Sequence, residues 1–257
     1  MVTAAGLTVP VVVMLALFGL VGGIGITALG PGGILPTIGL FTLTGLSPAE
    51  IAGTAIVTHV ATGVLATAAY TRSGQLREPE TRRTALILAG TAVLGTPAGV
   101  LVNTVVSGRV FGLVLGIFVA VAGALVLYRE RRHAAATRAH PSAPLVAGLG
   151  FAVAMAAGIV GIGGPMLTVP LLVALGVPVL ESLASAQAQS IVIATVGTLG
   201  YLANGAIDWP LAALVGIPEL AGVLLGWKIA HALPTRSLKY ALIFTLFALA
   251  PYLALHG

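Results

Sequence analysis

The sequence contains no cysteine and has few charged side chains. Its 257 residues include 12 Lys and Arg and 7 Asp and Glu, so 7% are charged, whereas about a quarter are charged in a soluble domain. The lack of cysteine excludes disulfides, thiolate metal sites and a cysteine nucleophile. So few charges cannot cover the surface of a soluble fold. This excludes an ordinary cytosolic enzyme, a disordered chain and a nucleic-acid binder.

Hydrophobic residues make up 58% of the chain, and 34 residues are glycine. Small residues let membrane helices pack closely. A helix that crosses the hydrocarbon core needs about 20 apolar residues. The first such run lacks the charged leading region of a cleaved signal, so it is expected to stay. The sequence predicts an all-α, multi-pass protein of the cell membrane, with spans at 9–29, 49–71, 84–104, 108–128, 144–160, 181–203, 210–229 and 237–255.

Two shorter apolar pieces, 33–46 and 164–177, each follow a glycine-rich break. They are too short to span the membrane comfortably, so we expect half-helices of re-entrant hairpins, with two full crossings as the alternative. The longest polar gap divides the chain nearly in half. The expected organisation is a first transmembrane repeat over 1–128, a basic cytoplasmic linker over 129–143 and a second repeat over 144–257.

The two halves resemble each other in sequence. Residues 30–77 align without gaps to the residues 131 positions later, and 98–101 align to 221–224. Glycine pairs alone could reflect composition, but Glu and Tyr also fall in register. Internal duplication is typical of transporter folds. The identical pairs are Gly30/Gly161, Gly32/Gly163, Gly33/Gly164, Thr37/Thr168, Gly45/Gly176, Glu50/Glu181, Tyr70/Tyr201 and Gly74/Gly205.

The basic residues indicate how the repeats are oriented, because cytoplasmic loops collect Lys and Arg. Eight simple spans would place eight basic residues on one side and four on the other. If each half begins with a hairpin, or with two full crossings, eleven of the twelve lie on one side and only Arg109 lies on the other. The pattern therefore favours inverted repeats.

The two glycine breaks are the main candidates for a binding site. Each precedes a short helix, and Pro36 or Pro165 falls in its first turn, where a missing N–H costs little. Glycines leave backbone N–H groups bare, and a helix N-terminus adds about half a positive charge. Together these form an anion site that needs no basic side chain, with tight turns and helix packing as the structural alternative. The candidate residues are Gly30, Gly32, Gly33, Thr37, Gly161, Gly163 and Gly164.

Neutral polar side chains interrupt the apolar run of the helix after each break. A spacing of four places Thr54 with Thr58, and Ser185 with Gln189, on one helix face. Such stripes suit the path of a polar solute; the alternative is hydrogen bonding between helices, which is common in membrane bundles. The candidate path residues are Thr54, Thr58, His59, Ser185, Gln187, Gln189 and Ser190.

Two ionisable residues, His59 and Glu219, are expected near the centres of spans. Ionisable groups at that depth are costly and often functional, so both are candidates for proton coupling; the alternative is a neutral packing role. Glu50 and Glu181 have a simpler explanation, because both fall in the first turn of a helix. The sequence contains no Walker motif, no paired catalytic carboxylates and no His-rich cluster. It therefore predicts no enzyme, no metal site and no cofactor.

The chain resembles the TauE/SafE family, described as sulfite exporters and anion permeases. The resemblance rests on the duplicated Gly-x-Gly-Gly segments at 30–33 and 161–164. It is strengthened by the stretch 181–209 and the glycine-rich span 216–226, and it covers nearly the whole chain. It implies export of sulfite, sulfoacetate or related small organosulfonates across the bacterial plasma membrane by a gradient-driven mechanism.

We therefore expect a secondary carrier for a small sulfur-containing oxyanion that works by alternating access. One alternative is a carrier of another solute, including a cation held by the carbonyl ends of the broken helices. Others are an intramembrane enzyme that uses His59 and Glu219, and a non-transporting subunit of a partner complex. The expected partners are the anionic substrate and the lipid bilayer, and a homodimer stays open.

Overall fold

A computed structural model describes residues 7–105 and 141–234 without a gap, together with single positions within 113–128 and 237–244. The expected spans 108–128 and 237–255, and most of the linker 129–143, lie outside the described residues. The described α-helices are α1 (Val9–Ala28), α2 (Ile34–Leu43), α3 (Pro48–Arg72), α4 (Pro79–Asn103), α6 (Ala143–Val160), α7 (Pro165–Leu175), α8 (Val179–Ala203) and α9 (Trp209–Ala232). The short 3-10 turn η1 (Pro31–Gly33) lies between α1 and α2, and a second one, η2 (Gln75–Arg77), lies between α3 and α4.

Six of the described helices are long and apolar enough to cross a membrane. These are α1, α3, α4, α6, α8 and α9, and they correspond to six of the expected spans. The shorter apolar helices α2 and α7 follow the two glycine breaks. The largest difference from expectation is at α4, which begins at Pro79 rather than near residue 84 because proline fits the first helical position.

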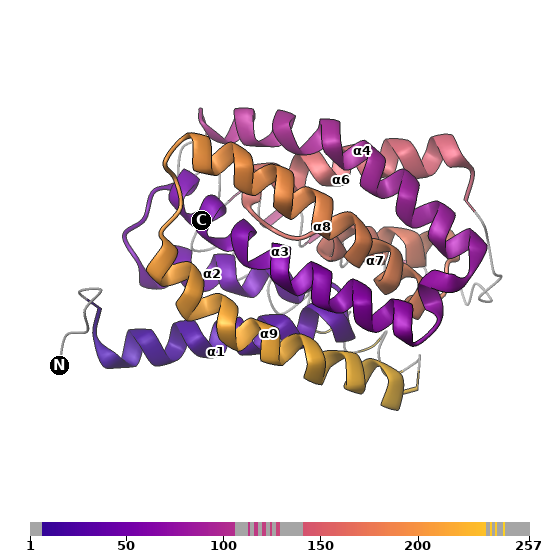
Figure 1. Ribbon diagram of the computed structural model, residues 1–257, viewed down its shortest axis with the longest axis horizontal. Coiled ribbons are helices and arrows are strands. Elements are labelled where there is room, and N and C mark those ends of the chain that lie inside the picture. Colours follow the sequence, from indigo (N-terminus) through magenta and orange to yellow (C-terminus); the bar gives the residue numbers. More distant parts are fainter. Residues whose placement is uncertain are drawn as a thin grey trace.

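The long helices lie side by side in three rows (Figure 1). The helices α3 and α8 form the middle row, α4 and α6 lie along one edge, and α1 and α9 lie along the other. In an apolar 18-residue stretch of each middle-row helix 61% of the residues are buried, against 28–44% in such stretches of the other four spans. Polar residues of α3 and α8 are therefore placed in the interior, away from lipid.

Details of the structure repeat at the 131-residue offset. The Tyr70 hydroxyl donates to the Thr27 carbonyl oxygen at 2.6 Å, and the Tyr201 hydroxyl donates to the Gly158 carbonyl oxygen at 2.7 Å. Both tyrosines are fully buried. The first glycine of each break also has a positive φ, 108° in one and 71° in the other. The duplicated sequence thus forms duplicated structure.

Close contacts at glycine hold the outer rows together. The helix α1 packs against α9, and α6 packs against α4, so each row combines one helix from each repeat. A side chain added at Gly99 of α4 would overlap the Met155 carbonyl oxygen of α6, and one added at Gly222 of α9 would overlap the Leu20 carbonyl oxygen of α1. Gly99 and Gly222 are equivalent in the repeat, so the same contact is made twice. Small residues at such contacts let helices pack in lipid.

The equivalent helices α3 and α8 run antiparallel. Gly53, near the start of α3, lies against Tyr201, near the end of α8. Gly63, farther along α3, lies against Ile191, which comes earlier in α8. Inverted repeats require equivalent helices that run in opposite directions. The packing therefore supports the inverted interpretation, which remains a prediction that cysteine labelling can test.

The start of α3 forms as its sequence indicates. The Ser47 side chain accepts a hydrogen bond from the Glu50 N–H, and the Glu50 carboxylate accepts one from the Ser47 N–H at 2.8 Å. This is a capping box. Glu181 lies in the first turn of α8, after an N-terminal Pro178 that makes no side-chain cap. The Glu50 carboxylate therefore has a local role at a helix start, and the same role for Glu181 stays a prediction.

We predict that positions 77 and 204 lie on opposite sides of the membrane. Both are exposed, one in the connector after α3 and one in the equivalent connector after α8. Because the sequence lacks cysteine, single Arg77→Cys and Asn204→Cys variants can be labelled in cells with a membrane-impermeant maleimide. For inverted repeats, one position should react only after permeabilisation. Reaction of both positions at the same stage would show parallel repeats instead.

A larger side chain at Gly99 should destabilise the row formed by α4 and α6. Overpacking costs about 1–3 kcal/mol, so Gly99→Val should lower the midpoint of thermal unfolding in detergent. Gly90→Val is the matched control, because a Cβ added at Gly90 of the same helix meets nothing within 4 Å. Equal midpoints for the two variants would contradict the assigned contact.

Candidate functional site

The two glycine breaks lie against each other in the interior. Residues 30–33 connect α1 to α2, and residues 161–164 connect α6 to α7. A Cβ added at Gly30 would lie 2.9 Å from the Pro165 carbonyl oxygen, and the Thr37 hydroxyl lies 3.5 Å from the Gly161 carbonyl oxygen. Every residue of both breaks is buried. The breaks of the two repeats are therefore neighbours.

His59 lies beside both breaks. It is a fully buried residue of α3. A Cβ added at Gly33 would lie 3.4 Å from His59 Cε1, and one added at Gly163 would lie 3.7 Å from His59 Cδ2. Nε2 is the ring atom between these two carbons, so its edge of the imidazole faces both breaks. Within the described part of the chain, Nε2 has no hydrogen-bond partner.

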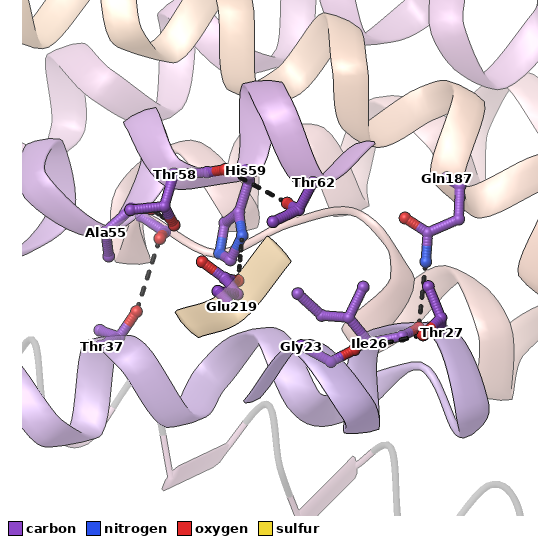
Figure 2. A network of polar contacts seen from close by, with 11 residues as sticks. Gly23, Ile26, Thr27, Thr37, Ala55, Thr58, His59, Thr62, Gln187 and Glu219 are labelled. Atoms are coloured by element: carbon purple, nitrogen blue, oxygen red, sulfur yellow. Dashed lines mark hydrogen bonds and ion pairs between the residues drawn. The ribbon is translucent and has the colours of Figure 1, made fainter. Parts of the chain in front are cut away.

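The other ring nitrogen of His59 faces Glu219 of α9 (Figure 2). His59 Nδ1 lies 3.1 Å from Glu219 Oε1, and both side chains are fully buried. This is an ion-pair distance, although the angle is outside hydrogen-bond geometry, and neither carboxylate oxygen has a hydrogen-bond partner among the described residues. Two ionisable groups buried together in a membrane span are costly and indicate a functional position.

The N-terminus of α7 presents backbone N–H groups that the described residues do not bond. No side chain caps this helix, and the Thr168 N–H bonds to the Gly164 carbonyl oxygen as the first turn closes. Among the described residues, the N–H groups of Gly163 and Gly164 make no hydrogen bond. The start of α2 differs, because η1 leads directly into it and the Ile34 N–H bonds within that turn. Free donors and the helix dipole together suit an anion.

The carbonyl ends of the broken helices, in contrast, are bonded. Both α1 and α6 end at a break, and their last carbonyl oxygens have no partner within the helix. Side chains from other helices donate to two of these oxygens in each helix, whereas the Gly163 and Gly164 N–H groups have no partner among the described residues. The four contacts are Tyr70 to Thr27 and Gln187 to Ile26 on α1, and Tyr201 to Gly158 and Asn103 to Ile159 on α6, at 2.6–3.0 Å.

Two of the predicted path residues hold connecting segments. Thr54 accepts a hydrogen bond from the Asp208 N–H at 2.9 Å, and Ser185 donates to the Thr81 carbonyl oxygen at 3.2 Å. Asp208 precedes α9 and Thr81 lies in the first turn of α4. The equivalent residues Thr54 and Ser185 thus each fix the start of an outer helix.

Other predicted path residues lie directly at the second break. The Ser190 hydroxyl oxygen is 2.8 Å from a Cβ added at Gly163, and Gln189 Oε1 is 3.0 Å from one added at Gly164. Gln189 Oε1 also accepts a hydrogen bond from the Thr168 hydroxyl at 2.5 Å. Thr168 was not predicted as a site residue. It is the repeat partner of Thr37, which was predicted, and this equivalence could have identified it.

Gln187 and Thr58 complete the predicted path. The Gln187 amide nitrogen donates to the Ile26 carbonyl oxygen at the end of α1 (Figure 2), whereas its Oε1 has no partner among the described residues. The Thr58 hydroxyl donates to the Ala55 carbonyl oxygen within α3 at 2.9 Å. Thr58 is therefore satisfied locally, and Gln187 has one free acceptor.

In this conformation the candidate site is closed. All of the predicted binding and path residues are buried, with Thr58 at 7% exposure. A pocket of about 610 Å³ opens elsewhere, beside the connector between α3 and α4, where Arg77 and Arg82 contribute to its lining. None of the predicted site residues lines that pocket. A solute reaches the glycine breaks only if the protein moves.

The fold and the site define a multi-pass membrane transport protein, in which two repeats bring broken helices and a buried ionisable pair together. The match to a family model makes the class specific. The chain belongs to the sulfite exporter TauE/SafE family, whose model matches residues 15–253.

Two similar proteins carry the names of membrane transporters. A stretch of 93 residues is 31% identical to the probable membrane transporter protein ORF9 of Sinorhizobium sp, and it covers 36% of each chain. A stretch of 98 residues is 29% identical to the probable membrane transporter protein YdhB of Bacillus subtilis strain 168, covering 38% of this chain and 40% of that one. The chain thus matches less than half the length of these relatives. No solved structure matches it.

Tyr70→Phe and Tyr201→Phe should destabilise the protein to a similar extent. Each substitution leaves a buried carbonyl oxygen at the end of a broken helix unbonded, which costs about 1–3 kcal/mol. We expect both to lower the thermal unfolding midpoint in detergent. Thr71→Val is a control, because this exposed hydroxyl bonds only to the Thr67 carbonyl oxygen of its own helix. Tyrosine variants as stable as this control would argue against the capping role.

Proposed function

We propose that the protein is a secondary carrier that exports a small sulfur-containing oxyanion such as sulfite or sulfoacetate. One observation carries the proposal: the unbonded N-terminus of α7 lies beside the unpartnered Nε2 edge of His59. The helix terminus attracts an anion, and a protonated imidazole adds a separate donor. Membership of the family supports a transport role, and the name of the family supports sulfite.

The same geometry disfavours a cation as substrate. In transporters with broken helices, carbonyl ends hold the cation. Here the carbonyl ends of α1 and α6 already accept four buried hydrogen bonds from side chains. Leaving each donor unsatisfied would cost about 1–3 kcal/mol. An anion at the α7 terminus meets no such cost.

A sulfite or sulfonate group suits this arrangement chemically. It presents three oxygens on one sulfur, which can accept several hydrogen bonds from converging donors. The Gly163 and Gly164 N–H groups supply two, and the Ser190 hydroxyl lies against the same break. No lysine or arginine is among the buried described residues. Neutral donors and a helix dipole bind an anion without a fixed counter-charge. The absence of a fixed cation at the described site favours release of the anion on the other side of the membrane.

Alternating access follows from the three rows of helices. We propose that the outer rows, α1 with α9 and α4 with α6, tilt about α3 and α8. Each outer row is held together by close backbone contacts at glycine and so moves as a unit. The glycine breaks lie between the rows, and the tilt opens them to one side of the membrane at a time.

Flux through proteoliposomes tests the proposal. We expect radiolabelled sulfite and sulfoacetate to cross only when the protein is present. Gly163→Leu should abolish the flux, because the side chain would occupy the space between Ser190 and His59. Gly148→Leu is the matched control, since a Cβ added at this α6 glycine meets nothing within 4 Å. Both variants must elute as a single species in gel filtration.

Two results would contradict the proposal. Flux of the Gly163→Leu variant equal to that of the control would remove the second break from the site. Absence of binding and flux for sulfite, sulfate, sulfoacetate and taurine would remove the sulfur oxyanion as substrate. Solute turnover without net flux would instead favour an intramembrane enzyme.

A further inference from the structure

The buried ionisable pair is present in only one of the two repeats. The repeat register pairs His59 with Ser190 at an offset of 131, and Glu219 with Thr96 at an offset of 123. Ser190 and Thr96 are also buried, yet both are neutral. Neutral residues therefore satisfy the packing at the equivalent positions. Packing does not explain why one repeat has a histidine and a glutamate in contact.

Without an added proton, the pair opposes an anion at the glycine breaks. The Glu219 carboxylate favours the proton of a neutral imidazole on the nearer nitrogen, Nδ1, 3.1 Å away. Nε2 is then a hydrogen-bond acceptor. An anion at the breaks would face this lone pair. The buried Glu219 carboxylate lies beyond it, on the other side of the imidazole ring. Like charges repel strongly in such a low-dielectric interior.

One added proton reverses this situation. The imidazolium carries N–H donors on both ring nitrogens. Nδ1 then forms a charged pair with Glu219, and Nε2 becomes a donor aimed at the breaks. The pair changes from a net negative charge to neutral, and the group that faces the anion changes from acceptor to donor. Proton binding and anion binding therefore assist each other.

Resting on the proposed function, we infer that the protein is an anion–proton symporter that moves one proton with each anion and exports a dianion. The proton lies between Glu219 and the substrate, on the His59 ring. Because the second repeat has no equivalent pair, the stoichiometry is one proton per transport cycle.

Among the residues that the structure describes, no other ionisable group lies near the breaks. The helices α1, α2, α6 and α7 contain no ionisable side chain. On the helices that carry or pack against the pair, the remaining ionisable groups lie toward the helix ends. These groups are Glu50, Tyr70 and Arg72 on α3, Glu181 and Tyr201 on α8, Lys228 and His231 on α9, and Glu80, Arg82 and Arg83 on α4.

The charge of the substrate then sets the direction of transport. A monoanion with one proton is electroneutral, so the membrane potential does not act on it, and an acidic exterior drives it inward. A dianion with one proton carries one net negative charge, which an inside-negative membrane potential drives outward. Export driven by the membrane potential therefore requires a doubly charged substrate, such as the doubly ionised form of sulfite or sulfoacetate with its sulfonate and carboxylate.

Proton uptake on binding tests the inference without any variant. The purified protein is placed in weak buffer with a pH indicator, and sulfoacetate is added, because it does not itself titrate near neutral pH. We expect about one proton taken up per sulfoacetate bound. The apparent affinity should fall by up to about tenfold per pH unit as the pH rises, as expected for one linked proton.

Glu219→Gln separates coupling from structure. Without the carboxylate, Nε2–H can face the breaks at any pH, so this variant should bind sulfoacetate with a flat pH dependence and no proton uptake. It should keep anion exchange across liposomes but lose its response to an imposed pH gradient. Glu181→Gln, the same substitution at the first turn of α8, is the control and should behave as the wild type.

The outcomes distinguish the inference from the function on which it rests. Sulfoacetate binding by the wild type without proton uptake would overturn the symport and leave the anion carrier intact. A Glu219→Gln variant that still takes up a proton would overturn the assignment of the pair. If sulfite, sulfate, sulfoacetate and taurine all fail to bind, the proposed function fails and the inference falls with it.

Discussion

A backbone polar group without a partner is costly in hydrocarbon, and this constraint governs both broken helices. At the carbonyl ends of α1 and α6, the protein meets it with buried tyrosine, glutamine and asparagine side chains that reach in from α3, α4 and α8. At the start of α7 the described residues provide no partner for Gly163 and Gly164. The polarity of the proposed site follows from that difference between the two ends, and it is the basis for proposing an anion as substrate.

The many glycines serve two purposes that composition alone does not separate. At Gly99 and Gly222 a glycine allows two helix backbones to touch, and a side chain would push the outer rows apart. At Gly163 the neighbours are instead the Ser190 hydroxyl and the His59 ring. Glycine at this position allows polar side chains, rather than another backbone, to pack closely against the break. One residue type thus builds the scaffold in one place and the proposed site in another.

Hydropathy and capping patterns predicted the helices well, because span length and helix starts are local properties. The Ser47–Glu50 capping box formed as expected. The pairing of α1 with α9 was not predictable, since it depends on backbone contacts between distant glycines. His59 and Glu219 were each recognisable as unusual, but no local pattern indicates that residues so far apart in the chain meet. The spacing of four placed Thr54 with Thr58, and Ser185 with Gln189, on one helix face. The hydrogen bonds of Thr54 and Ser185 to connecting segments depend on tertiary structure and could not be predicted from that spacing.

The location of the ionisable pair links the proposed movement to the proposed coupling. His59 is on α3, in the middle row, whereas Glu219 is on α9, in an outer row. Glu219 lies at one of the close contacts between α9 and α1, since a side chain added at Gly23 would overlap its carbonyl oxygen. If the α1–α9 row tilts as a unit, Glu219 moves relative to the imidazole, and the separation of the pair changes with the side to which the site opens. In the proposed mechanism, a symmetric scaffold supplies two alternating conformations, and the single asymmetric pair distinguishes them.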